Sequence, residues 1–226
     1  MTRAAVVLLA GGSGSRVGAE VNKVLLPLGG VPLVAHSVRT ILEVDDVHRL
    51  VVVVRPGDRE ALSSAVAAYL GPNDAWIVDG GTDRHGSEWH ALQVLAPDIE
   101  GEEVDVVAVH DAARPLAPAG LFEEVIGAAA RNGGAIPVVP AGPLSHRDGS
   151  LGPGDLVAVQ TPQAFRARPL LEAYRLAERE DFTGTDTAAC LARYSSLGIV
   201  GVPGSATNLK VTYPEDLATA EALGRR

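Results

Sequence analysis

The feature that most constrains the fold is the alternation of short, valine-rich apolar runs with longer segments of helical periodicity. Continuous apolar runs of this length are typical of strands that are covered on both faces. They predict strands over residues 4–10, 48–54, 75–78, 104–109, 135–139, 156–160 and 199–202. The segments between them predict helices over residues 32–42, 58–70, 83–95, 118–131, 168–177, 186–193 and 214–223.

This order of elements predicts an α/β fold with a doubly wound, mostly parallel sheet and helices on both faces, as in Rossmann-like nucleotidyltransferases. A chain of 226 residues that is 46% hydrophobic can bury the core of one such domain, so residues 1–226 are assigned to a single domain. Residues 141–155 are rich in glycine and proline. They predict a loop or short hairpin arm within the domain, because the alternation resumes after them.

Composition narrows the classes of partner. Acidic residues outnumber basic ones by 28 to 19, and no Lys/Arg run exceeds two residues, which argues against nucleic-acid binding. No apolar stretch approaches the roughly 20 residues that span a bilayer, so no membrane association is expected. Cys190 is the only cysteine, which excludes an intrachain disulfide and a cysteine-based zinc site, and a cytoplasmic location is expected.

A glycine loop follows the first predicted strand, in the run Ala10, Gly11, Gly12, Ser13, Gly14, Ser15, Arg16. Its backbone N–H groups can approach a polyphosphate closely, although a plain tight turn is the alternative. A dinucleotide fingerprint fails, because Val17 stands where a third small residue is required and Arg55, not an acid, ends the second strand. The P-loop pattern is also absent.

Charged residues follow this loop and a later strand. Lys23 comes seven residues after Arg16, so the two predict cations beside one phosphate-sized cavity, with ordinary solvated charges as the alternative. Asp111 stands at the end of a buried strand, where it can bind a ribose hydroxyl or help hold Mg²⁺, or else cap the following turn. His110 is interpreted as a packing residue.

Three further strand ends carry polar groups. Gly81 and Thr82 precede a helix whose first turn holds Ser87, a set that can hydrogen-bond a base edge, with helix capping by Thr82 or Asp83 as the alternative. Thr161 and Thr185 are two more candidates that can also act as caps. Lys210 lies on a short apolar segment before the last predicted helix.

At these residues the chain resembles the 2-C-methyl-D-erythritol 4-phosphate cytidylyltransferases and the related ribitol-5-phosphate cytidylyltransferases. The resemblance covers nearly the whole chain, with several blocks in one order. They are residues 10–16, Lys23, residues 80–84, residues 109–115, residues 160–163, Thr185 with Asp186, and residues 208–217.

The resemblance implies that the chain transfers CMP from CTP to a polyol phosphate, 2-C-methyl-D-erythritol 4-phosphate above all, with release of pyrophosphate and with Mg²⁺ as cofactor. It implies that CTP binds the glycine loop, with cytosine near Gly81, Thr82 and Ser87 and the ribose near Asp111 and Ala112. Arg16 and Lys23 then stabilise the transition state, and Lys210 positions the attacking phosphate. Fixed cations suit this chemistry because negative charge develops during phosphoryl transfer.

One region departs from the family. Members usually carry an Asp-Thr-Ile/Val-Lys run after the fifth strand and an arginine eight residues before the threonine of Thr-Pro-Gln, whereas here residues 140–146 and Pro153 occupy those places. The candidate replacements for that arginine at the substrate are Arg114, His146 and Arg147, alongside Thr161 and Thr185. The arm usually builds the family's dimer and looks shortened here, so both a homodimer and a monomer stay open.

Two alternatives to the main hypothesis follow. The acceptor can be a different one, such as ribitol 5-phosphate or a phosphonate. From another class, the chain can be a CTP-binding module without turnover, although Arg16, Lys23 and Lys210 argue against this because a mere binder needs no transition-state cations.

Overall fold

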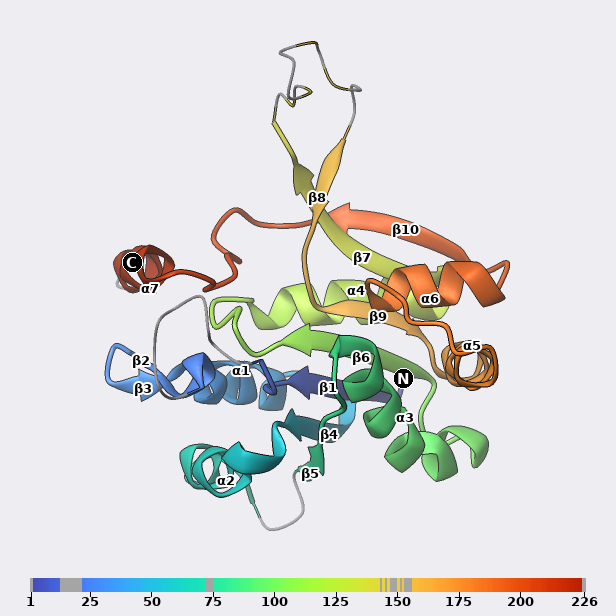
Figure 1. Cartoon of the computed structure of the whole chain (residues 1–226), viewed down its shortest axis with the longest axis horizontal. Coiled ribbons are helices and arrows are strands. Elements are labelled where there is room, and N and C mark those ends of the chain that lie inside the picture. The colour runs from blue at the N-terminus through green and yellow to red at the C-terminus, as the bar shows by residue number, and fades with distance from the viewer. Residues whose placement is uncertain are drawn as a thin grey trace.

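The computed structural model describes residues 2–12, 22–71, 75–142, 144, 146, 150, 152 and 156–224. Within them an eight-stranded sheet forms the centre of the molecule (Figure 1). Its strands are β1 (Ala4–Leu9), β4 (Val47–Val54), β5 (Trp76–Asp79), β6 (Val106–Asp111), β7 (Gly133–Pro140), β8 (Val157–Val159), β9 (Gln163–Arg166) and β10 (Gly198–Pro203). A separate antiparallel hairpin pairs β2 (Pro27–Leu28) with β3 (Val31–Pro32).

The strand order is β10-β7-β9-β6-β1-β4-β5, with β8 added alongside β7. β1 pairs in parallel with β4 and β6, β4 with β5, and β7 with β10. The exceptions are β9, which is antiparallel to both of its neighbours, and β8, which is antiparallel to β7. The predicted mostly parallel sheet is therefore confirmed.

Seven α-helices of the described chain surround the sheet. They are α1 (Leu33–Leu42), α2 (Arg59–Ala67), α3 (Arg84–Glu100), α4 (Ala119–Asn132), α5 (Ala167–Arg179), α6 (Thr187–Tyr194) and α7 (Pro214–Gly224). Two of them start on aspartate caps, because the Oδ1 atoms of Asp83 and Asp186 each accept a backbone N–H at 2.7 Å. α4 ends at Gly133, whose φ of 109° suits glycine and turns the chain into β7.

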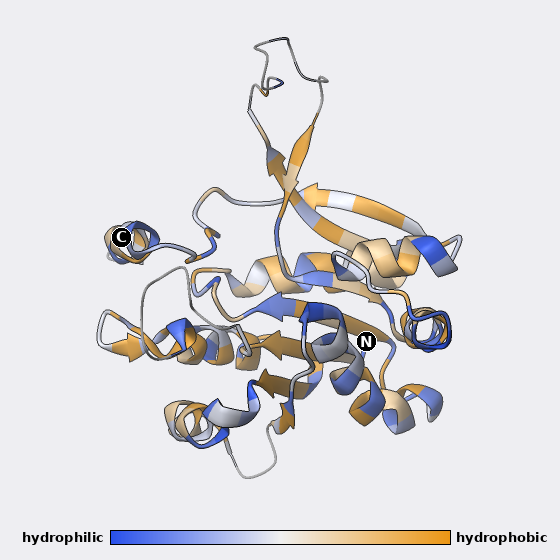
Figure 2. Ribbon diagram, in the orientation of Figure 1, coloured by the Kyte–Doolittle hydropathy of each residue, from blue (hydrophilic) through white to orange (hydrophobic). Residues whose placement is uncertain are grey.

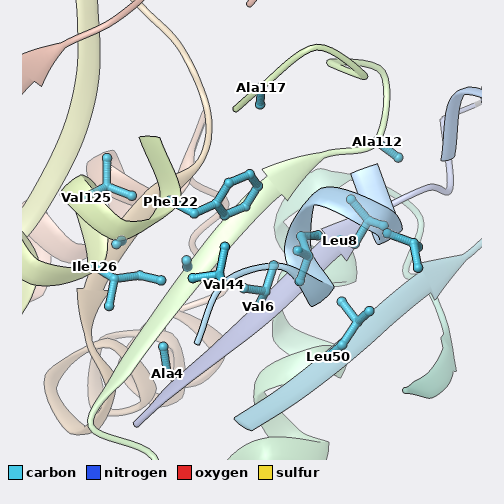
Figure 3. Close-up of a cluster of buried hydrophobic side chains, with 14 of the residues drawn as sticks. Ala4, Val6, Leu8, Val44, Leu50, Ala112, Ala117, Phe122, Val125 and Ile126 are labelled. Carbon is cyan, nitrogen blue, oxygen red and sulfur yellow. The ribbon is translucent and has the colours of Figure 1, made fainter. Parts of the chain in front are cut away.

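The core lies on both faces of the sheet, as a doubly wound fold requires. On one face, Ala4, Val6 and Leu8 of β1 pack with apolar residues of α1, α2 and α4 (Figure 3). On the other face, Ala5 and Val7 pack with residues of α3, α5 and α6. Successive strand residues point to opposite faces, so every residue of such a strand must be apolar. This is the physical cause of the valine runs in the sequence.

Three features of the structure differ from the sequence prediction. Strand β9 was not predicted. Its four residues follow directly after Pro162 and consist of a polar glutamine, two apolar residues and an arginine, a mixture that does not indicate a strand. The β2–β3 hairpin is too short to show a periodicity. Helix α3 continues through Pro97 to Glu100, whereas the pattern ended it at Leu95.

Strand β8 pairs antiparallel with the end of β7, and the two strands project together from the sheet (Figure 1). Most of the predicted loop or arm over residues 141–155, which lies between these strands, falls outside the described residues. The strands of this β7–β8 arm are apolar (Figure 2), and Val157 and Val159 are 50% and 41% exposed. Leu144 and Leu156 are similarly exposed. Across the described ranges, no helix has the length and apolar character to cross a membrane.

Candidate active site

A cavity of about 550 Å³ opens at the carboxyl ends of β1, β4, β5 and β6. Parallel strands end at this edge of the sheet, where α/β folds bind their ligands. Its lining combines glycines, cations and two carboxylates. The lining residues are Leu9, Gly11, Gly12, Lys23, Val24, Arg55, Gly81, Thr82, Asp83, Arg84, Ser87, Asp111, Ala113 and Lys210. Eight of the predicted site residues therefore meet at one cavity: Gly11, Gly12, Lys23, Gly81, Thr82, Ser87, Asp111 and Lys210.

The turn between β5 and α3 forms one wall. A Cβ on Gly81 would lie 2.7 Å from the carbonyl carbon of Gly86, so only glycine fits there. The Oγ of Ser87 accepts the Gly81 N–H at 3.1 Å and donates to the Asp83 carbonyl at 2.7 Å. Ser87 thus holds the turn in shape and faces the cavity. The capping alternative is confirmed for Asp83, whose side chain caps α3.

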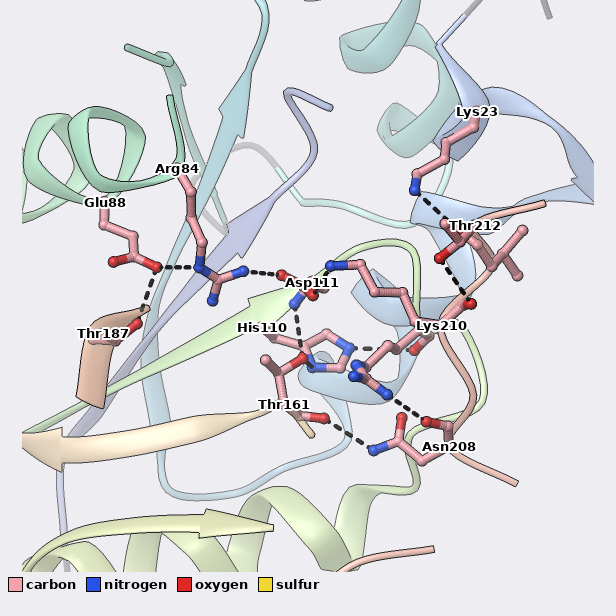
Figure 4. Close-up of polar contacts among 12 residues, drawn as sticks. Lys23, Arg84, Glu88, His110, Asp111, Thr161, Thr187, Asn208, Lys210 and Thr212 are labelled. Carbon is pink, nitrogen blue, oxygen red and sulfur yellow. Dashed lines mark hydrogen bonds and ion pairs between the residues drawn. The ribbon is translucent and has the colours of Figure 1, made fainter. Parts of the chain in front are cut away.

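A line of alternating charges runs from Arg84, at the start of α3, through Asp111 to Lys210 (Figure 4). Lys210 Nζ lies 2.7 Å from Asp111 Oδ2, and Arg84 Nη1 lies 2.5 Å from Asp111 Oδ1. Burial is the largest influence on the pKa of Asp111 and acts to raise it. Arg84 and Lys210 together outweigh burial and hold the pKa well below its ordinary value, so Asp111 is ionised at neutral pH.

Lys23 approaches the cavity from the short helical turn Lys23–Leu25. Its Nζ donates to the carbonyl of Val211 at 3.0 Å, next to Lys210 in the chain. The preceding Asn22 is fully buried, and its amide donates to the carbonyl of Ala10 at 2.7 Å. These bonds join the Lys23 turn to both the glycine loop and the Lys210 segment, so Lys23 and Lys210 share one cavity although they are far apart in the sequence. The predicted pairing of Lys23 with Arg16 is not tested, because Arg16 lies outside the described residues.

A buried polar layer supports Asp111 from behind. Asp111 N–H donates to Thr161 Oγ1 at 3.1 Å, and that hydroxyl lies 3.2 Å from His110 Nδ1. His110 Nε2 lies 3.2 Å from the carbonyl of Arg114, which can only accept, so the ring donates from Nε2. Burial lowers the pKa of His110 to about 4, and the ring is neutral. The interpretation of His110 as a packing residue fits this contact set.

The other predicted site residues lie elsewhere. Ala10, Ala112 and Thr161 are buried behind the cavity wall and do not line it. Arg114 also lies outside the lining, with Nη1 donating to the Asn208 carbonyl at 2.7 Å. Thr185 is exposed just before α6, where Asp186, and not the threonine, is the cap. Ser13, Gly14, Arg16 and Arg147 lie outside the described residues, as does Pro153.

Sequence reasoning assigned no role to Arg55, Arg84 or Glu88. Arg55 lines the cavity and pairs with Asp58 at 2.8 Å. Arg84 stood within the glycine-rich block, and Glu88 follows it by four residues, the spacing at which opposite charges meet on a helix. That spacing is a usable signal for the pair, but nothing in the sequence shows that Asp111 joins it.

The described side chains do not form a preformed Mg²⁺ site. In the described part of the chain, no group of three or more His, Cys, Asp or Glu side chains could hold a metal ion. Both carboxylate oxygens of Asp111 are already paired with cations. A metal at Asp111 would therefore share the carboxylate with Arg84 and Lys210 or displace one of them.

The position of the cavity and the positive groups around it define the class: an α/β protein that binds a phosphorylated nucleotide at its strand ends. Comparison with known proteins narrows this class. The chain belongs to the 2-C-methyl-D-erythritol 4-phosphate cytidylyltransferase family, whose model matches residues 4–226. It is thus an enzyme of the nucleotidyltransferase type.

Individual relatives agree with the family. The 2-C-methyl-D-erythritol 4-phosphate cytidylyltransferase of Pelotomaculum thermopropionicum is 38% identical over 231 residues, which cover 99% of this chain and 94% of that protein. The crystal structure of the enzyme of that name from Thermus thermophilus is 30% identical, with a TM-score of 0.75 and full coverage of both chains. A 4-diphosphocytidyl-2C-methyl-D-erythritol synthase from Anaerococcus prevotii has a TM-score of 0.84 at 23% identity, covers 100% of this chain and 97% of its own, and supports the fold.

Proposed function

We propose that the chain transfers CMP from CTP to 2-C-methyl-D-erythritol 4-phosphate and releases pyrophosphate. An oxygen of the acceptor phosphate attacks the α-phosphorus of CTP in line, a new P–O bond forms, and the bond from the α-phosphorus to the bridging oxygen breaks. The observation that carries this proposal is the meeting of Lys23 and Lys210 with the Gly11–Gly12 backbone at one cavity. Negative charge that develops on the phosphoryl oxygens and on pyrophosphate is stabilised by such fixed cations.

The roles of the individual residues follow from their places around the cavity. Gly11 and Gly12 line the cavity, and their backbone N–H groups are proposed to bind the triphosphate. For Ser13, Gly14 and Arg16, which lie outside the described residues, the same role is proposed from their sequence positions alone. The turn with Gly81, Thr82 and Ser87 receives the cytosine, and Asp111 at the end of β6 receives the ribose, whereas the buried Ala112 does not line the cavity. Lys210 then exchanges its contact with Asp111 for the acceptor phosphate, since its side chain is 39% exposed.

Mg²⁺ is proposed to arrive with CTP. Because the described side chains form no preformed metal site, its ligands are mainly phosphate oxygens and water, with Asp111 as a candidate protein ligand. When bound there, the ion supplies further positive charge at the triphosphate.

For the acceptor phosphate we infer a role for Arg114. Its Nε makes no hydrogen bond within the described residues, but the atom is buried and Arg114 does not line the cavity, so binding of the acceptor would require this side chain to move. Arg147, His146, Thr161 and Thr185 remain candidates for the same substrate. Because Pro153 replaces the family's arginine, we expect a raised Michaelis constant for the acceptor, by about ten-fold to a hundred-fold for one lost charge-assisted contact.

The arm is proposed to join two copies of the chain. Val157 and Val159 are about half exposed in an apolar strand pair, and apolar surface of this kind is stabilised when a partner covers it.

A pyrophosphate-release assay tests the proposed reaction. CTP is offered with 2-C-methyl-D-erythritol 4-phosphate, ribitol 5-phosphate and a phosphonate, and ATP, GTP and UTP replace CTP in parallel. We expect turnover with CTP and the methylerythritol substrate. Faster turnover with ribitol 5-phosphate or the phosphonate would change the acceptor. CTP binding without pyrophosphate release from any acceptor would favour the binding-module alternative.

A further inference from the structure

Glu88 is a buried carboxylate whose contacts lead to the cavity. It lies in the second turn of α3, is 1% exposed and does not line the cavity. Tyr174 of α5 donates its hydroxyl to Oε2, and Thr187 of α6 donates to Oε1 at 2.9 Å. Arg84 Nε lies 2.9 Å from the same Oε1. Three elements of the fold therefore fix both oxygens of this carboxylate.

Arg84 connects Glu88 to the cavity (Figure 4). Its guanidinium lies between Glu88 and Asp111, with Nη1 at 2.5 Å from Asp111 Oδ1. Asp111 in turn holds Lys210. Two positive and two negative groups thus alternate from the buried interior to the cavity wall, and the row carries no net charge. Burial is the largest influence on the pKa of Glu88 and raises it, whereas Arg84, Tyr174 and Thr187 act to lower it, so these contacts favour the ionised form of Glu88.

The contact between Glu88 and Arg84 depends on charge more than on hydrogen-bond geometry. Arg84 Nε makes no aligned hydrogen bond, although Oε1 lies within ion-pair distance. The guanidinium is therefore shared between two carboxylates that draw it in different directions. Without the charge of Glu88, only Asp111 would attract it, and the planar fork would turn to engage both oxygens of Asp111.

We propose that Glu88 is a positioning residue for the nucleotide: fixed by Tyr174 and Thr187, it restrains Arg84 and so keeps Asp111 oriented toward the cavity. This inference rests on the proposed function in one respect, the placement of the CTP ribose at Asp111. Glu88 itself touches no substrate in this scheme. It acts on nucleotide binding through the orientation of Arg84 and Asp111.

The central test is Glu88→Gln, which removes the charge and keeps the shape. Calorimetry without acceptor should show a dissociation constant for CTP raised about ten-fold, the factor expected when one hydrogen bond to a charged group is lost. In steady-state assays, KM for CTP should rise with it while kcat stays within about three-fold, because Lys23 is untouched. Thr187→Val is expected to disturb the fold less than Glu88→Gln. It should raise the dissociation constant for CTP about three-fold.

A matched control variant and a variant that relocates the carboxylate distinguish a positioning role of Glu88 from an effect on stability alone. Leu95→Ala removes a buried side chain two turns further along α3 without touching Arg84, so it should lower Tm but leave the affinity for CTP unchanged. The double substitution Glu88→Ala with Thr187→Glu moves the carboxylate to α6. Thr187 Oγ1 lies 2.9 Å from Glu88 Oε1, so a carboxylate there can reach Arg84 and should restore CTP affinity to within about two-fold.

If the Glu88→Gln and Thr187→Val variants have a lower Tm but bind CTP as tightly as the wild type, the positioning role is overturned. A double variant that folds without regaining affinity would also overturn it. Failure of the proposed function looks different. A wild-type chain that binds CTP but releases no pyrophosphate overturns the reaction and leaves the binding comparison decisive for Glu88. A wild-type chain that does not bind CTP overturns both.

Discussion

The cavity wall and the β7–β8 arm differ in where their side chains find contacts. Around the cavity, the buried Glu88 and Asp111 lie against Arg84, and Asp111 also lies against Lys210. On the arm, Leu144, Leu156, Val157 and Val159 are about half exposed. A buried charge is stabilised only when its counter-charge lies in the same fold. An exposed apolar strand can instead be covered by a second molecule. The described charges at the cavity are therefore paired within one copy of the chain, whereas the arm would be covered by the proposed second copy.

The largest expected effect is on turnover. Lys23→Met keeps the buried stem but removes the ammonium that lines the cavity, so kcat should fall by about 10² or more while the fold is retained. Arg16→Ala should have an effect of the same order. Initial rates of pyrophosphate release measure both. Wild-type turnover in Lys23→Met would show that this lysine serves the fold alone, through contacts such as the one with the Val211 carbonyl.

The second-largest expected effect is a loss of stability when Asp111 is replaced. Asp111→Asn leaves Arg84 with Glu88 alone and Lys210 without its partner carboxylate. We expect the free energy of unfolding to fall by about 3 kcal/mol, at the low end for a broken buried pair, because Lys210 is 39% exposed and can turn to water. Urea unfolding at neutral pH measures the change. A loss near zero would mean that the cavity does not depend on its internal charge balance.

A fall in pH should lower the free energy of unfolding through His110, which lies in the buried polar layer behind Asp111. Since burial lowers the pKa of His110 from 6.5 to about 4, the unfolded chain takes up this proton first as the pH falls. The contribution of His110 to stability is full above about pH 6.5 and is lost toward pH 4, or about 2 kcal/mol between pH 7 and pH 5. Urea unfolding of wild type and His110→Gln across this range should show a steeper loss in the wild type. Parallel curves for the two proteins would contradict a neutral, buried His110.

The smallest expected effect is on association. Val157→Asp places a charge on the arm and should raise the dissociation constant of a dimer by about ten-fold or more, since one buried valine contributes roughly 1.5 kcal/mol or above. Light scattering over a dilution series measures it. Val94→Asp, at a comparably exposed apolar position on α3, is the matched control and should have no effect. A wild type that stays monomeric at every concentration would show that the arm needs no second copy.

The sequence by itself determined most of the secondary structure. Apolar runs, unbroken over residues 4–10 and over residues 50–54, predicted β1 and β4, and Asp83 and Pro214 stand at the observed starts of α3 and α7. The rule that ligands bind at strand ends singled out the glycine loop and Asp111, and the structure places Gly11, Gly12 and Asp111 with Lys23 and Lys210 at one cavity. These inferences succeed because they rest on local periodicity and on the rule that parallel strands end together.

Tertiary structure alone decided which charges meet. Lys210 and Asp111 come from distant segments, and the Glu88 contacts join α3 to residues on α5 and α6. The antiparallel placement of β9 between β6 and β7 was likewise invisible in four residues of mixed polarity. A periodicity shows which face of an element is buried, but the partner across that face depends on how the whole chain packs. For this reason the sequence located the cavity, and only the fold revealed the row of charges that orders its wall.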